Sequence, residues 1–97
     1  MQIRDLFEAK VRSAVKECYE IGYAPTRFES MIRKSHPVEV AKKFVVSGEF
    51  QYGFKELLKL GKSDLTIESI MLDESFKELF SSNELAAAEW RLKMGKH

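Results

Sequence analysis

The sequence predicts an all-α fold, a compact orthogonal bundle of about six or seven short helices. Apolar residues recur at helical spacing through most of the 97 residues, and no segment shows the period-two alternation of a half-buried strand. Glycines, prolines and capping residues divide the chain into short helical segments. This length suits one modest hydrophobic core, so we expect residues 1–97 to form a single helical domain.

The first and longest helix is predicted over residues 2–21, because apolar residues from Ile3 to Cys18 share one helical face. Gly22 should end this helix. Cys18 lies on the apolar face, so we interpret it as a small buried hydrophobe rather than a nucleophile. It is the only cysteine, which excludes a disulfide within the chain and a cysteine metal cluster.

Two shorter helices should follow. Thr26 and Glu29 have the spacing of a capping box, which predicts a helix start at this point. Ser35-His36-Pro37 should break that helix, and Pro37 suits the first position of the next one. Ser47-Gly48 is expected to end the third helix, and a loop should lead to the centre of the chain.

The central stretch predicts two helices joined by a tight turn. One helix should run from Gly53 to Leu60, with Gly61 as its left-handed C-terminal residue. Either Asp64 or Thr66 could cap the next helix, and the sequence does not choose between them. Its polar face is predicted to carry acidic and hydroxyl side chains, namely Glu68, Ser69, Asp73 and Glu74. These acids would repel phosphates, which argues against a helix-turn-helix motif that enters DNA.

Two further capping boxes are predicted near the C-terminus, at Ser75–Glu78 and at Ser81–Glu84. The second should open the C-terminal helix. That helix has a broad apolar face, and we expect both of its flanks to be packed. The residues of this face are Leu85, Ala86, Ala88, Trp90, Leu92 and Met94.

The residue types present exclude several classes of activity. The sequence contains neither a phosphate-binding glycine loop nor a His-Glu-x-x-His motif, and its two histidines have no metal-ligand spacing. We therefore expect no enzymatic activity, no cofactor and no metal. No apolar run is long enough to span a membrane and no signal region opens the chain, so we expect a cytoplasmic protein without a membrane or small-molecule partner.

Charge is distributed unevenly along the chain. Residues 1–62 carry twelve Lys/Arg against eight Asp/Glu, a net charge of +4, and residues 63–97 carry four against seven, a net charge of −3. The candidate binding surface is the basic segment 27–43, which two helix ends and a proline turn would present together. Its cations are Arg27, Arg33, Lys34, Lys42 and Lys43. A solvated pair of helix faces is the ordinary interpretation, and a phosphate contact site is the functional one.

A series of short motifs resembles an uncharacterised small helical domain of bacteria. The motifs are Gly22-Tyr23-Ala24-Pro25-Thr26-Arg27-Phe28, Val40-Ala41-Lys42-Lys43, Gly53-Phe54 with Leu57 and Gly61, Asp64-Leu65-Thr66-Ile67-Glu68, Leu79-Phe80, and Glu84 ahead of Arg91-Leu92. That domain occurs alone or appended to restriction-type nucleases. The resemblance covers the chain beyond residue 10 and implies a shared fold, since its motifs are mostly caps, turns and core positions. The chain departs from the family pattern at Lys62-Ser63, where Arg-Leu is common.

Two functional hypotheses follow. The first is a non-enzymatic accessory or protein-interaction domain, which predicts an exposed apolar patch and a protein partner or a homodimer. The alternative is a nucleic-acid-binding accessory module that uses the basic segment, which predicts binding that weakens steeply with salt. The second hypothesis also requires that the five cations share one face of the folded domain.

Overall fold

The computed structural model describes residues 2–46 and 52–95, and every regular element in these two ranges is helical. The all-α prediction is therefore confirmed. The helices and 3₁₀ turns are α1 (Ile3–Glu20), α2 (Thr26–Lys34), α3 (Pro37–Val46), α4 (Tyr52–Lys59), η1 (Ser63–Leu65), α5 (Ile67–Met71), η2 (Lys77–Leu79) and α6 (Ser82–Gly95).

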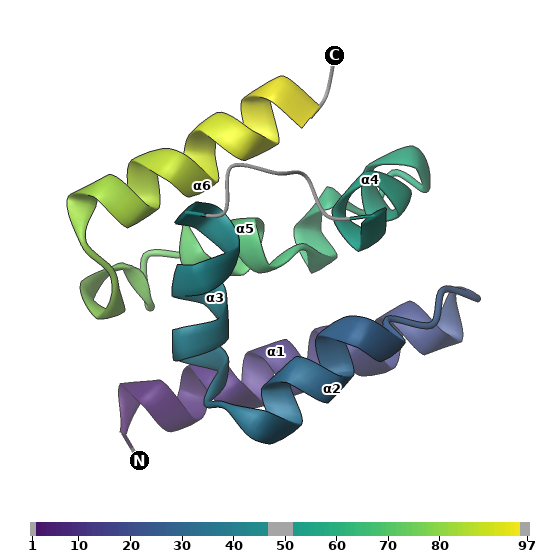
Figure 1. Ribbon diagram of the computed structural model, residues 1–97, viewed down its shortest axis with the longest axis horizontal. Coiled ribbons are helices and arrows are strands. Elements are labelled where there is room, and N and C mark those ends of the chain that lie inside the picture. The colour runs from purple at the N-terminus through teal and green to yellow at the C-terminus, as the bar shows by residue number, and fades with distance from the viewer. Residues whose placement is uncertain (1, 47–51, 96–97) are drawn as a thin grey trace.

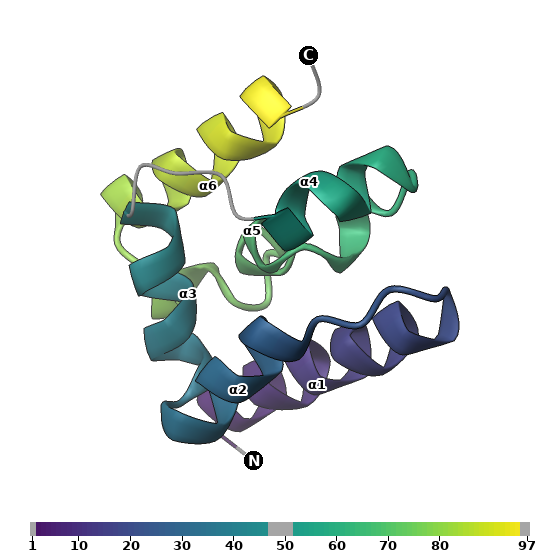
Figure 2. The same cartoon turned by 45° about the vertical axis from the view of Figure 1, so that its right-hand side comes forward.

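The helices form two layers joined by α3. Figures 1 and 2 show α1 and α2 side by side in one layer, with α3 crossing steeply toward a second layer that contains α5 and α6. The short helix α5 lies on the side of the second layer that faces α1 (Figure 1), and it contacts α1, α3 and α6. The radius of gyration is 12.3 Å, as expected for a compact domain of this length.

Two glycines end their helices as predicted. Gly22 and Gly61 have φ angles of 88° and 72°, in the left-handed region that side chains with a Cβ rarely adopt. After Gly61, the Lys62 N–H donates to the Leu57 carbonyl oxygen at 2.8 Å, while the Gly61 N–H donates to Leu58 at 3.1 Å. This pair of bonds is a Schellman motif, which satisfies carbonyl groups at the end of α4.

Two of the predicted caps form. Thr66, rather than Asp64, caps α5, because its Oγ1 accepts a hydrogen bond from the Ser69 N–H at 3.2 Å. At α6 the capping box is reciprocal: the Ser81 N–H donates to Glu84 Oε1 at 2.8 Å, and the Glu84 N–H donates to Ser81 Oγ at 3.1 Å. The sequence therefore locates the start of α6 correctly.

The capping box predicted at Thr26 is wrong. Helix α2 begins at Thr26 itself, so Pro25 occupies the cap position and has no N–H for a reciprocal bond. The capping box at Ser75–Glu78 is also wrong. The Ser75 N–H donates to Asp73 Oδ1 at 2.8 Å, which makes a turn, and a single turn of 3₁₀ helix follows at Lys77–Leu79.

An aromatic cluster anchors α1 to the segment before α6. The ring of Phe7 meets Phe76 at a centroid distance of 5.3 Å and Phe80 at 5.4 Å, both in edge-to-face geometry. All three side chains are buried. This cluster closes one side of the core and holds η2 against the first helix.

The predicted helix end at Ser47-Gly48 lies outside the described residues. Helix α3 is described as far as Val46, and α4 begins at Tyr52, one residue before the predicted start. In the two described ranges, none of the helices combines the length and the apolar character that crossing a membrane requires.

Candidate functional site

The five predicted nucleic-acid contacts lie on α2 and α3, as expected, and two of them border one cavity. Arg27 and Lys43 line the same cavity, although they belong to different helices. Lys34 is exposed elsewhere on α2, and Lys42 is half-buried on α3. Arg33 is exposed and forms an ion pair with Glu29, a residue that does not line the cavity.

Arg33 forms an ion pair one helical turn back. Its Nη2 lies 3.7 Å from Glu29 Oε2, and the hydroxyl of Tyr19 on α1 donates a hydrogen bond to Glu29 Oε1 at 2.6 Å. The hydrogen bond to the carboxylate raises the pKa of Tyr19. Glu29, which the sequence assigned to a helix cap, instead links α2 to α1 and partly balances Arg33.

The cavity lies between the layer of α1 and α2 and the segment from α4 to α5. Its volume is about 650 Å³, within the range of about 300–1,000 Å³ typical of small-molecule sites. Most of its lining is apolar, and it includes Val11, Phe28 and Ile70. Arg27 and Lys43 are exposed lining residues, so they lie where the cavity meets solvent.

Two of the polar groups that line the cavity are Cys18 and Thr66. Cys18 is 3% exposed, and burial, followed by the nearby charge of Glu17, raises the pKa of its thiol. The thiol is therefore protonated at neutral pH, in agreement with its interpretation as a buried hydrophobe. The Thr66 hydroxyl donates to the Ser63 carbonyl oxygen at 2.7 Å and accepts from Ser69, so its hydrogen bonds lie within the turn.

Glu68 also lines the cavity, which corrects the prediction that it lies on a solvated polar face. It is 1% exposed, and its Oε2 accepts a hydrogen bond from Arg91 Nε on α6 at 2.8 Å. Helix α5 is a little over one turn long and is wedged between α1 and α6, so positions around most of its circumference are buried. Arg91 follows the buried Ala88 by three residues on α6, which is the sequence signal for its inward position.

One group of possible metal ligands occurs in the described ranges, at Asp5, Glu8 and His36. Their ligand atoms lie within 4.8 Å of one another. Each of two members already has a protein partner, because Glu8 pairs with Arg12 at 3.2 Å and His36 Nδ1 accepts from the Val38 N–H at 3.1 Å. The sequence separates His36 from the two acids, so spacing alone did not reveal this group.

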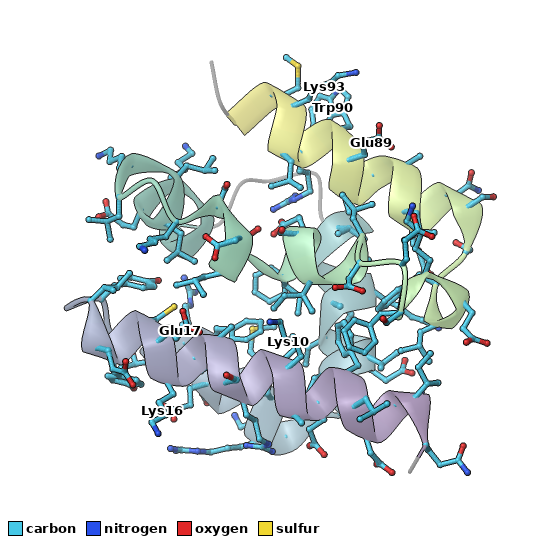
Figure 3. The ribbon with its side chains drawn as sticks, turned by 180° about the vertical axis from the view of Figure 1, so that it is seen from behind. Lys10, Lys16, Glu17, Glu89, Trp90 and Lys93 are labelled. Carbon is cyan, nitrogen blue, oxygen red and sulfur yellow. The ribbon has the colours of Figure 1, made fainter. Side chains whose placement is uncertain are left out.

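The outer side of α6 carries an apolar stripe, defined here as Ala86, Trp90 and Met94. These residues are four positions apart and are all exposed, with Trp90 at 55% and Met94 at 48% of their full accessible area. Figure 3 shows Trp90 pointing away from the domain, flanked by Glu89 and Lys93. The expectation that both flanks of α6 are packed is therefore wrong, because α3 and α5 cover its opposite side.

Comparison with known proteins gives no match, since no family model, curated protein or solved structure is significantly similar to this chain. The resemblance to a small bacterial helical domain therefore stays a prediction. The interpretation of function depends on the geometry of three features: the apolar stripe, the cavity and the cations of α2 and α3.

Proposed function

We propose that this protein is a non-enzymatic interaction domain that pairs with a second copy of itself through the apolar stripe of α6. The exposure of Trp90 in the middle of this stripe carries the proposal. Isolated exposed apolar residues are common on protein surfaces, but here three share one side of one helix. Tryptophan is also enriched among the residues that dominate binding energy at protein interfaces.

The stripe is complementary to itself when two copies of α6 meet in antiparallel orientation about a two-fold axis at Trp90. The axis places the two Trp90 side chains against each other. Ala86 and Met94 are equally far from Trp90 along the helix, so Ala86 of one copy faces Met94 of the other. A small side chain opposite a large one makes the two surfaces complementary in volume on each side of the axis.

The charges beside the stripe fit the same arrangement. Glu89 and Lys93 lie on one side of Trp90, and both are exposed. In the antiparallel pair, Glu89 of one copy lies at nearly the same level as Lys93 of the other. Opposite charges at the rim of an interface favour the correct orientation and register more than they add affinity.

The size of the stripe sets the expected strength of the dimer. A single helical face buries less than the roughly 1,200–2,000 Å² of a stable protein interface, which places this contact among weak or transient ones. We therefore expect a monomer–dimer equilibrium with a micromolar dissociation constant. Sedimentation velocity across the micromolar range measures it directly.

The decisive variant is Trp90→Ser/Met94→Ser. Removing an aromatic anchor of about 2 kcal/mol or more weakens an interface roughly 30-fold, so this variant should sediment as a monomer at low micromolar concentrations, where the wild-type protein dimerises. Leu6→Ser is the matched control, because Leu6 is similarly exposed but lies on α1. A wild-type protein that remains monomeric, or a dimer that survives the double substitution, would refute the proposal.

Charge exchange tests the orientation of the two helices. Lys93→Glu should weaken the dimer, because it places acids opposite each other at the rim of the interface. Glu89→Lys/Lys93→Glu should restore it, since exchanging both charges recreates the opposite pairs. In a parallel dimer, where each residue faces its own equivalent, Lys93→Glu only exchanges one like-charge pair for another, so the single and double variants should dimerise alike.

Nucleic-acid binding is the second candidate, supported by Arg27 and Lys43, which line the same cavity from two helices. It predicts binding of labelled single- or double-stranded DNA at low salt that falls steeply as salt rises. An Arg27→Glu/Lys43→Glu variant should lose this binding. The ion pair between Arg33 and Glu29 and the partial burial of Lys42 make this surface a weaker candidate than α6.

A further inference from the structure

We propose that the cavity between the two layers is a binding site for a small amphipathic anion, with the apolar part of the ligand inside and its carboxylate or phosphate at the rim. This site is separate from the apolar stripe of α6, so the proposal does not depend on self-association. No sequence motif indicates a small-molecule site, because the lining residues come from five separate segments of the chain.

The interior of the cavity suits an alkyl chain rather than a polar ligand. Its walls include side chains from α1, α2, α3 and α5, and most of them are apolar. The hydroxyl of Thr66 bonds within its own turn, and the Cys18 thiol is a weak donor. Transfer of an apolar chain from water into such a space is favourable, roughly in proportion to the area buried.

Glu68, the carboxylate beside the cavity, does not strongly repel an anionic ligand. Glu68 lies beside the cavity, but its Oε2 accepts the 2.8 Å hydrogen bond from the Arg91 guanidinium. The buried pair therefore presents little net charge to a neighbouring alkyl chain. A cationic ligand would gain little from a carboxylate that is already paired.

The rim supplies the selectivity for an anion. Arg27 and Lys43 approach the cavity from α2 and α3, and within the described residues neither forms an ion pair with a protein carboxylate. Arg27 can bind a carboxylate or phosphate with two parallel hydrogen bonds, and Lys43 adds a second positive charge. An apolar cavity with a few convergent polar groups is the usual form of a ligand site.

Calorimetric titration with decanoate, below its micellar concentration, is the direct test. Decanoate should bind with one-to-one stoichiometry and should slow modification of the buried Cys18 by a thiol reagent, because the ligand fills the space beside the thiol. The uncharged alcohol 1-decanol should bind more weakly. Vesicles of an anionic phospholipid form a separate arm that distinguishes a free amphiphile from a membrane surface.

Arg27→Gln/Lys43→Gln should weaken decanoate binding roughly five-fold or more, as expected for the loss of two exposed charge contacts. Binding of 1-decanol should be unchanged. Lys10→Gln/Lys16→Gln is the matched control, because it removes the same charge from exposed positions on α1, labelled in Figure 3, that do not line the cavity. It should bind decanoate like the wild-type protein.

A cavity-filling substitution supplies an independent test. Ala14 is buried in the lining, and Ala14→Leu should occupy part of the space and reduce the affinity for both probes. Circular dichroism checks that this variant is folded, and the surface variants above remain informative if it is not. Absence of decanoate binding, equal effects of the two charge variants, or binding to vesicles alone would overturn the proposal.

Discussion

Removal of Arg91 gives the sharpest test of the buried core. In Arg91→Met, Glu68 keeps its 1% exposure but loses the guanidinium that lies 2.8 Å away. Breaking a buried ion pair by removing one partner costs about 3–5 kcal/mol, out of a total stability of about 5–15 kcal/mol for a domain. With a urea m value of about 1–3 kcal/mol per molar, the unfolding midpoint should fall by at least about 1 M. Urea unfolding followed by circular dichroism measures this change.

The stability that Arg91→Met loses should depend on pH, because the Glu68 carboxyl group titrates. Burial raises the pKa of Glu68 above its ordinary value of 4.5, and the hydrogen bond from Arg91 opposes this increase. The folded protein therefore holds this proton more tightly than the unfolded chain. Its contribution to stability is fully present below about pH 4.5 and is lost as the pH rises through the folded pKa. Without Arg91 the opposing effect disappears, so Arg91→Met should be more destabilising at pH 7 than at pH 4.

A double variant distinguishes the effect of the two charges on stability from the effect of the volume that the two side chains fill. Glu68→Leu/Arg91→Met replaces both charges with apolar side chains, and such replacements are often neutral or stabilising. It should recover most of the stability that Arg91→Met loses. A loss below about 1 kcal/mol in Arg91→Met, or the same loss at both pH values, would show that the two charges are not held in a dry interior.

Three smaller predictions concern the turns and the thiol. Gly61→Ala should lower the unfolding free energy by about 1 kcal/mol, because φ at this position is 72°, and Lys62→Ala is its control in the same urea experiment. Ser81→Ala should lower the unfolding free energy by about 1 kcal/mol, because it removes the hydrogen bond from the Glu84 N–H. Ser82→Ala, at the neighbouring position, should lower it less. Wild-type stability in Ser81→Ala would contradict the predicted cap. Cys18 has a raised pKa, so the stability of the protein should fall as the pH rises past about 9, where the unfolded thiol ionises first. Thiol labelling should be much slower in the folded protein than in urea.

Local chemistry was sufficient to predict most of the helices. Gly22 and Gly61 end helices because only glycine adopts their backbone conformation at no cost, and the sequence shows this directly. The Ser81–Glu84 box also forms between residues that are close in sequence. The similar pattern at Thr26 and Glu29 failed because Pro25 takes the cap position and Tyr19, from another helix, binds the carboxylate. A tertiary contact had a stronger effect there than the local motif.

The features of the site depend on tertiary packing and were largely missed. Glu68 is polar, so its residue type predicts exposure. It is buried because α1 and α6 cover opposite sides of the short helix α5, and the sequence of α5 alone does not reveal this packing. The cavity arises where segments distant in sequence fail to fill the space between them, which no local pattern encodes. The interaction hypothesis predicts an exposed apolar patch, but the sequence does not locate it at Trp90. The apolar pattern of α6 predicts that its whole apolar face is packed.

The most direct test of self-association uses Trp90, the only tryptophan in the chain, as its own reporter. Its emission and its quenching by acrylamide should be measured as the protein concentration rises through the micromolar range. Pairing through α6 predicts a shift to shorter wavelength and weaker quenching at high concentration, with Met94→Ser moving both changes to higher concentration. Emission and quenching that stay constant over this range would contradict a dimer that buries the apolar stripe.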